Sequence, residues 1–264
     1  MLKLVWCEIY KYKRNKTILI LTSLALLFPA ALTLFTKSNI AEATNTTEFH
    51  AYYDSLFNNN LVYSSMLLLP CLFGCISAIL FFSERDCDTF KNLQVIPVTR
   101  NQLIFAKLIV MYLWSEIYSI VSVLSVTVFC LVLEPLAIYD VLFKLLCSII
   151  VGITMATVCL PIVVIVIYMN QSYLLSLLMS FMYTVVNWLL FILFASNDSA
   201  LLWLPLMNGL MFVSRLGAWR KAVLGMSELV PLPFGTYMHV VLYLLFAFVI
   251  CILLIVRFYK KWSR

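Results

Sequence analysis

Few residues in this chain could take part in chemistry, because most of its side chains are apolar. Glu116 lies about nine residues inside a long apolar stretch, where an ionised carboxylate is costly in lipid and therefore marks a candidate functional group. The alternative is a structural carboxyl, hydrogen-bonded to Ser, Tyr or a partner helix. Asn187, in a later apolar stretch, could line a substrate path or join helices through hydrogen bonds. His239, near the start of the last stretch, fits an interface residue better than a proton relay.

Motifs for enzymatic chemistry are missing from the sequence. There is no Gly-x-Ser-x-Gly, no His-Glu-x-x-His, and no Gly-x-x-x-x-Gly-Lys-Ser/Thr loop for ATP phosphates. Cys71 and Cys75 share a helix face, but no His or carboxylate joins them at ligand spacing, so we expect no metal site. An intramembrane enzyme using Glu116 or His239 is kept as an alternative, as is a channel or signalling subunit.

The elements that must position these residues are long apolar helices. Hydrophobic residues make up 64% of the chain, charged residues 11%, and the mean hydropathy is +1.03. A spanning helix needs about 20 mostly apolar residues. Six stretches meet this length, and they predict an all-α integral membrane protein with spans at 17–36, 61–83, 108–133, 145–169, 173–195 and 237–256.

The basic residues predict the orientation of these spans. Of the 18 Lys and Arg residues, 13 fall before the first span, between the second and third, or after the sixth, and five fall on the other side. This asymmetry places both termini in the cytosol. The net charge of +6 is therefore explained by topology, and we expect no nucleic-acid partner.

Residues 1–15 form an amphipathic segment, with Leu2, Val5, Trp6 and Ile9 on one helical face. The pattern predicts a helix in the membrane interface. A cleaved secretory signal is the alternative, although the following apolar core is longer than usual for one. We expect most of the cysteines to act as small apolar packing residues. A disulfide bond between Cys130 and Cys147, both near outer helix ends, stays open.

Two outer segments differ in polarity. Residues 38–60 are polar and read as an outer loop. Residues 197–235 are too apolar for a solvated loop, yet their apolar part covers only about 22 Å as a helix, short of a roughly 30 Å hydrocarbon core. Pro205, Gly209 and Gly217 interrupt this part. We expect a re-entrant helical hairpin that enters the outer leaflet and returns, packed on protein.

Residues 84–107 form the one capped, charge-rich stretch between spans. Asp86 or Asp88 can cap a short helix on which Phe90, Leu93 and Ile96 recur three apart, and Pro97 ends it. Thr99 and Gln102 then form a capping box that starts the helix carrying Arg100 and Lys107 into the third span. These signals predict a rigid element parallel to the membrane.

This arrangement resembles the type 2 permeases of ATP-binding cassette (ABC) transporters. They share the interfacial helix, six spans, a coupling helix between the second and third spans, and a re-entrant hairpin before the sixth. The local sequence pattern is similar as well: an acidic residue ends the second span, and Thr, Leu, Pro-x-x-Arg and a Lys follow it. The corresponding residues here are Glu84, Thr89, Leu93, Pro97 to Arg100, and Lys107. The family commonly has Gly before the Thr, where this chain has Asp88.

The resemblance implies several properties. The coupling residues would be Glu84, Asp86, Asp88, Thr89, Phe90, Leu93, Ile96 and Arg100. They would contact a cytosolic ABC ATPase dimer that holds ATP and Mg²⁺, because this chain has no cofactor site of its own. A second permease, identical or homologous, would pair with the chain in the bilayer, with the path near the second and fifth spans.

A narrower resemblance is to small Gram-positive permeases that give immunity or resistance to lantibiotics, bacitracin and related peptides. It rests on the chain's size, the lack of a fused ATPase, the opening Glu8-x-x-Lys11-x-Lys13-Arg14, and Pro29 in the first span. It implies an exporter in the cytoplasmic membrane of a Gram-positive bacterium. The substrate would be a peptide antibiotic, a bacteriocin or another amphipathic or lipophilic molecule.

Overall fold

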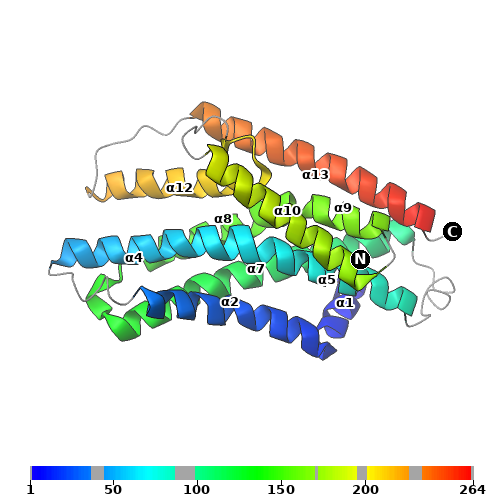
Figure 1. Cartoon of the computed structure of the whole chain (residues 1–264), viewed down its shortest axis with the longest axis horizontal. Helices are drawn as coiled ribbons and strands as arrows, with labels where there is room; N and C mark the ends of the chain where they lie inside the picture. The colour runs from blue at the N-terminus through cyan, green and yellow to red at the C-terminus, as the bar shows by residue number, and fades with distance from the viewer. Residues whose placement is uncertain are drawn as a thin grey trace.

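The computed structural model describes residues 2–36, 45–86, 99–169, 172–194, 201–225 and 234–262, and these residues contain helices but no strand. The helices run roughly side by side along one long axis (Figure 1). One end of the bundle carries α1 (Leu2–Arg14), the last turns of α5 (Leu69–Asp86) and the end of α13 (Phe234–Trp262). We call it the terminal end and the opposite one the distal end.

Six helices in the described residues are long and apolar enough to cross a membrane, which confirms the predicted all-α class and the number of spans. They cover Lys16–Phe35, Thr46–Phe82, Arg100–Leu133, Val141–Met169, Tyr173–Phe194 and Tyr237–Tyr259. Each overlaps one predicted stretch. The first is α2 (Lys16–Phe35), the third α7 (Arg100–Leu133) and the fifth α10 (Tyr173–Phe194).

The second span is longer than predicted. The polar residues expected to form an outer loop instead make α4 (Thr46–Asn60), which continues through a π-helical stretch, η1 (Leu61–Leu68), into α5. Asn45 and Glu48 form a capping box at its start. Tyr52, Tyr53, Leu56 and Phe57 are buried on one face of α4, and their burial explains why a polar segment is helical here.

The fourth span is divided in two. Helix α8 (Val141–Val158) ends at Cys159, and α9 (Leu160–Met169) follows at once. Pro161 lacks the amide hydrogen that a continuous helix would need, so the break lies where the sequence requires it. A short 3₁₀ helix, η2 (Pro135–Ala137), connects α7 to the fourth span.

Residues before the sixth span form α12 (Pro205–Val223), a single helix that lies along α8 at the distal end (Figure 1). Pro205 begins it, as is common at a first helical position. Gly209 and Gly217 do not interrupt it, contrary to our expectation. Residues 195–200 and 226–233 lie outside the described residues, so the re-entrant hairpin remains a prediction.

The core is formed by the second, third and fourth spans. Helix α7 packs on α2 and α8, and α5 packs on α9 and α10. In the second span 72% of the most apolar window is buried, against 17% in the fifth and the sixth. Helices α10 and α13 therefore present most of their apolar side chains outward, as helices in contact with lipid or another apolar partner do.

Candidate functional site

A buried lysine joins three helices at the terminal end. The Lys107 side chain of α7 is fully buried, and its Nζ donates to the carbonyl oxygen of Leu80 in α5 at 2.5 Å. Nζ also lies 3.8 Å from Oε2 of Glu8 in α1, whose Oε1 pairs with Lys11 at 2.9 Å. An ammonium buried in this way must keep such partners, because desolvation without them would be costly. Lys107 therefore ties α1, α5 and α7 to one another.

The start of α7 is capped as predicted. The amide of Gln102 donates to Oγ1 of Thr99 at 3.4 Å, and the amide of Thr99 donates to Oε1 of Gln102 at 3.0 Å. The reciprocal pair satisfies two amide groups at the helix start. The first turn of α7 is therefore a defined helix terminus, with Arg100 exposed on it.

The structure places only part of the predicted coupling segment. Glu84 and Asp86 lie in the last turns of α5, and Arg100 lies in the first turn of α7. Asp88, Thr89, Phe90, Leu93 and Ile96 lie outside the described residues. The described flanks of the segment, α5 and α7, are the two helices that Lys107 joins.

Glu116 lies midway along α7, against α8. A Cβ added at Gly152 would lie 2.8 Å from the carboxyl atoms of Glu116, so the carboxyl packs directly on the α8 backbone. The neighbouring Ser115 hydroxyl donates to the carbonyl oxygen of Gly152 at 3.0 Å. Both carboxyl oxygens of Glu116 are buried and have no hydrogen-bond partner among the described residues. Among the described residues, no Ser, Tyr or neighbouring helix of this chain binds the carboxyl, so the structural role of Glu116 remains a prediction.

An apolar groove of about 610 Å³ opens beside Glu116, between α7, α8 and α13. Its walls include Ile109 and Leu113 of α7, Ile153 of α8 and Phe248 of α13. These four side chains are all exposed, so the groove opens outward from the bundle. In a membrane it would open to lipid.

Asn187 and His239 lie apart from this groove. Asn187 is buried on α10, where its amide nitrogen donates to the Tyr183 carbonyl at 2.9 Å. His239 packs edge-on against Trp203, with ring centroids 4.8 Å apart. It lies nine residues before Phe248, about 14 Å along α13 at the rise of an α-helix. The fold therefore does not bring Glu116 and His239 together.

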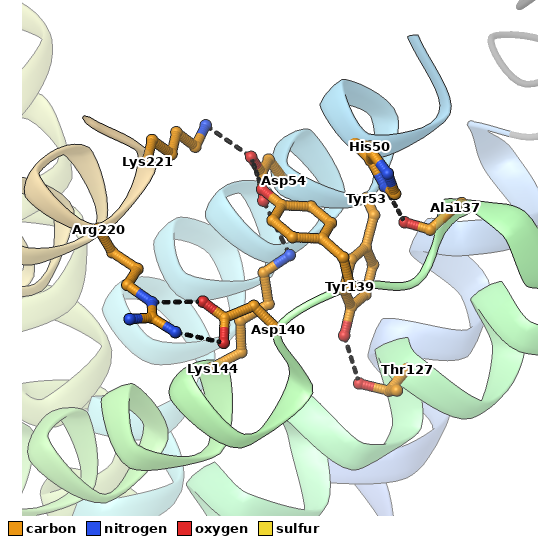
Figure 2. A network of polar contacts seen from close by, with 10 residues as sticks. All are labelled: His50, Tyr53, Asp54, Thr127, Ala137, Tyr139, Asp140, Lys144, Arg220 and Lys221. Atoms are coloured by element: carbon orange, nitrogen blue, oxygen red, sulfur yellow. Dashed lines mark hydrogen bonds and ion pairs between the residues drawn. The ribbon is translucent and has the colours of Figure 1, made fainter. Parts of the chain in front are cut away.

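A polar cluster that the sequence did not reveal lies at the distal end (Figure 2). Asp54 of α4 is buried, with Nζ of Lys144 at 2.8 Å from Oδ1 and Nζ of Lys221 at 2.7 Å from Oδ2. The Tyr139 hydroxyl also donates to Asp54. Burial raises the pKa of Tyr139, and the Asp54 carboxylate raises it further, so the phenol keeps the proton that it donates.

A further ion pair also joins α12 to the cluster. Nε and Nη2 of Arg220 donate to the two carboxylate oxygens of Asp140, at 2.7 and 3.1 Å. Asp140 precedes α8 with φ of 47°, a left-handed conformation that Asp tolerates better than most residues. Its carboxylate does not cap α8 and is used by Arg220 instead.

Aromatic rings surround the buried Lys144 ammonium. Its Nζ lies 3.4 Å from the ring centroid of Tyr53, 4.4 Å from that of Tyr139 and 5.6 Å from that of Phe57. Cation–π attraction at these distances helps to replace lost hydration. The Tyr53 hydroxyl also shares a hydrogen bond with the Thr127 hydroxyl of α7, at 2.9 Å (Figure 2).

The cluster borders a cavity of about 330 Å³ between α4, α8 and α12. Three cations and two carboxylates line one part, namely Lys144, Arg220, Lys221, Asp54 and Asp140. The remainder is mostly Leu, Met, Phe and Val side chains. The cavity can therefore hold a molecule with both a polar and an apolar part.

Within the described residues no group of His, Cys, Asp and Glu could hold a metal ion. Cys130 and Cys147 are both free thiols in this structure.

A family model described as ABC-2 family transporter protein matches residues 4–187, more than two thirds of the chain. The match covers α1, the first four spans, the coupling segment and most of α10. No curated protein matches the chain.

Proposed function

Because this chain belongs to the ABC-2 family of transporter proteins, we propose that it is the membrane-spanning permease subunit of an ATP-driven exporter. It is a multi-pass membrane protein with six apolar helices. In the proposed topology both termini and residues 84–107 face the cytosol, and α12 lies on the outer side. The orientation rests on the distribution of Lys and Arg.

The observation that carries the proposal is the buried junction at Lys107. A partner pushing on residues 84–107 would act on the end of α5 and the start of α7, and both helices meet at the Lys107–Leu80 hydrogen bond. The ion pair with Glu8 extends the junction to α1. A displacement of the coupling segment would therefore move three helices together instead of one.

The energy source would be a separate protein. The sequence contains no Gly-x-x-x-x-Gly-Lys-Ser/Thr loop, so ATP and Mg²⁺ would be held by a cytosolic ABC ATPase dimer. The exposed apolar face of α10, with Leu174, Phe181 and Leu193, leaves room for a second permease copy beside the fifth span.

For the substrate, we propose a peptide antibiotic of the lantibiotic or bacteriocin type, or a similar amphipathic molecule, expelled from the cytoplasmic membrane of a Gram-positive bacterium. The distal cavity supports an amphipathic substrate, since it combines charged and apolar walls. Export, as opposed to import, follows from the small permeases that the sequence resembles.

The partner assignment is tested by co-purification. Leu93→Asp or Phe90→Asp should abolish recovery of a co-expressed cytosolic ABC ATPase and leave the amount of permease in the membrane unchanged. Leu136→Asp is the matched control, because Leu136 is 63% exposed at the distal end, far from the coupling segment. Undiminished recovery of the ATPase with both coupling variants would contradict the proposal.

The substrate is tested separately. Expression of the permease with its ATPase should raise the concentration of a lantibiotic that stops growth, and the coupling variants should remove this protection. An unchanged inhibitory concentration would contradict the peptide substrate and leave the permease assignment standing. The remaining alternatives are an intramembrane enzyme and a channel or signalling subunit. Activity of the purified chain without any ATPase would favour the former, and conductance or sensor-kinase binding without ATP the latter.

A further inference from the structure

Glu116 is the one acidic side chain among the residues that line the α7–α8–α13 groove. Tyr112, the other side chain there with an oxygen, uses its hydroxyl in a hydrogen bond with Thr157 at 3.0 Å. The groove thus has a single unsatisfied polar group, which sits on a wall of Ile, Leu and Phe. Leaving a buried carboxyl without a partner costs more free energy than a typical hydrogen bond contributes to stability, so a ligand that supplies a donor would be favoured there.

The depth of Glu116 restricts the ligand. It is the seventeenth of the 34 residues of α7, so about 24 Å of helix lies on either side of it. The amine of a phospholipid headgroup stays at the membrane surface and does not reach this depth. A matching ligand must carry its cation or donor into the hydrocarbon region on an apolar body.

The size of the groove favours a small molecule. Its volume of about 610 Å³ lies within the range of small-molecule pockets. Its lining runs along α7 from Phe105 to Ile120, about 22 Å, which suits an elongated hydrocarbon chain. Exposed Ile109, Leu113 and Ile153 at its mouth allow entry from the bilayer without passage through water.

We propose that this groove is a binding site for lipophilic amines, in which the Glu116 carboxylate pairs with the ligand's ammonium and the Ile, Leu and Phe walls hold its hydrocarbon part. The site needs only α7, α8 and α13, so it is independent of the proposed ATPase and of the peptide substrate. Gly152 leaves room for the carboxyl in its observed position against α8, since an added Cβ would lie 2.8 Å from the carboxyl atoms.

The test uses the purified full-length chain in lipid nanodiscs, without an ATPase. The probe is a dodecylamine that carries a diazirine, and the matched uncharged probe is the same molecule with an alcohol in place of the amine. After irradiation, mass spectrometry should find amine adducts on residues of the groove, such as Tyr112 and Phe248. Excess unlabelled dodecylamine should compete them away, and the alcohol should label these residues far less.

Two variants identify the site. Glu116→Gln should reduce the groove adducts of the amine by at least roughly tenfold, the loss expected for one charge-assisted hydrogen bond. Ile153→Trp should block labelling by filling the groove while Glu116 stays in place. Glu134→Gln, on the residue that follows the last turn of the same helix, should change nothing.

Amine adducts that persist in Glu116→Gln, or equal labelling by amine and alcohol, would overturn the proposal. A further result would also overturn it: a photoreactive p-benzoylphenylalanine at position 153 that cross-links, in cell membranes, to a helix of another protein. Loss of ATPase co-purification in the coupling variants has no bearing on these measurements, so the two proposals fail independently.

Discussion

Arg220 donates from two nitrogens to both carboxylate oxygens of Asp140, and this pair fastens α12 to the start of α8. The two residues are 80 positions apart in the chain. Together with the Lys221–Asp54 pair, the Arg220–Asp140 pair holds α12 at the distal end, so two separate ion pairs join this helix to the bundle, one to the start of α8 and one to α4.

Arg220→Ala should therefore loosen α12. Deuterium uptake of residues 216–223 should rise, while uptake of α5 should stay unchanged. Arg220→Lys should give an intermediate rise, because an ammonium cannot reproduce the two parallel bonds of a guanidinium. Arg257→Ala on α13 is the control, and uptake equal to wild type in Arg220→Ala would show that the ion pair does not hold the helix.

Asp54→Ala should be among the most destabilising changes. It leaves the buried Lys144 ammonium without its carboxylate, a loss of about 3–5 kcal/mol for a buried pair. The thermal unfolding midpoint in nanodiscs measures it. Adding Lys144→Met should recover much of the loss, since the uncompensated charge is then removed. A double variant no more stable than Asp54→Ala alone would contradict this account.

Gly74→Ala should force α5 and α10 apart. An added Cβ at position 74 would meet the Ser180 side chain inside van der Waals contact and would lie 3.2 Å from Ile162. Overpacking of this kind costs about 1–3 kcal/mol, again visible as a lower unfolding midpoint. Gly217→Ala is the matched control, because a Cβ there meets nothing within 4 Å. Combining Gly74→Ala with Ser180→Gly should give less destabilisation than the sum of the two changes.

Lys107→Met should release α1 from the bundle. Methionine fills a similar volume but can neither donate a hydrogen bond to the Leu80 carbonyl nor form an ion pair with Glu8. Deuterium uptake of residues 2–14 should rise, whereas Lys16→Met, an exposed change at the start of α2, should leave it as in the wild type. Unchanged uptake in Lys107→Met would mean that apolar contacts alone hold α1.

The features that are predicted well from the sequence depend on residues that lie close together along the chain. The Thr99–Gln102 capping box and the six apolar lengths are encoded within a few residues or one continuous stretch. The prediction of a loop at α4 is wrong, because the apolar face of this segment is buried in spite of its Asn and Glu residues. The Asn45–Glu48 capping box and the spacing of Tyr52, Tyr53, Leu56 and Phe57 were the signals that could have identified it.

The distal cluster could not be predicted in the same way. Asp54 lies 90 positions from Lys144, and a single sequence shows no link between them. Charge counting placed Lys144, Arg220 and Lys221 on the same side of the membrane but could not pair them. The position of Glu116 in an apolar stretch marks it in the sequence, whereas the groove beside it depends on Phe248 and Ile252 of α13, more than 130 residues later.

Helices α4, η1 and α5 form one continuous rod from Thr46 to Asp86, with the π-helical stretch at Leu61–Leu68. Its 41 residues extend for about 60 Å, and Asp54 lies about 48 Å from the terminal end. A tilt of about 5° at that end would carry Asp54 sideways by about 4 Å, more than the length of either of its ion pairs. If η1 does not bend and α8 and α12 do not move with α4, a tilt at one face of the membrane breaks the Asp54 ion pairs at the other.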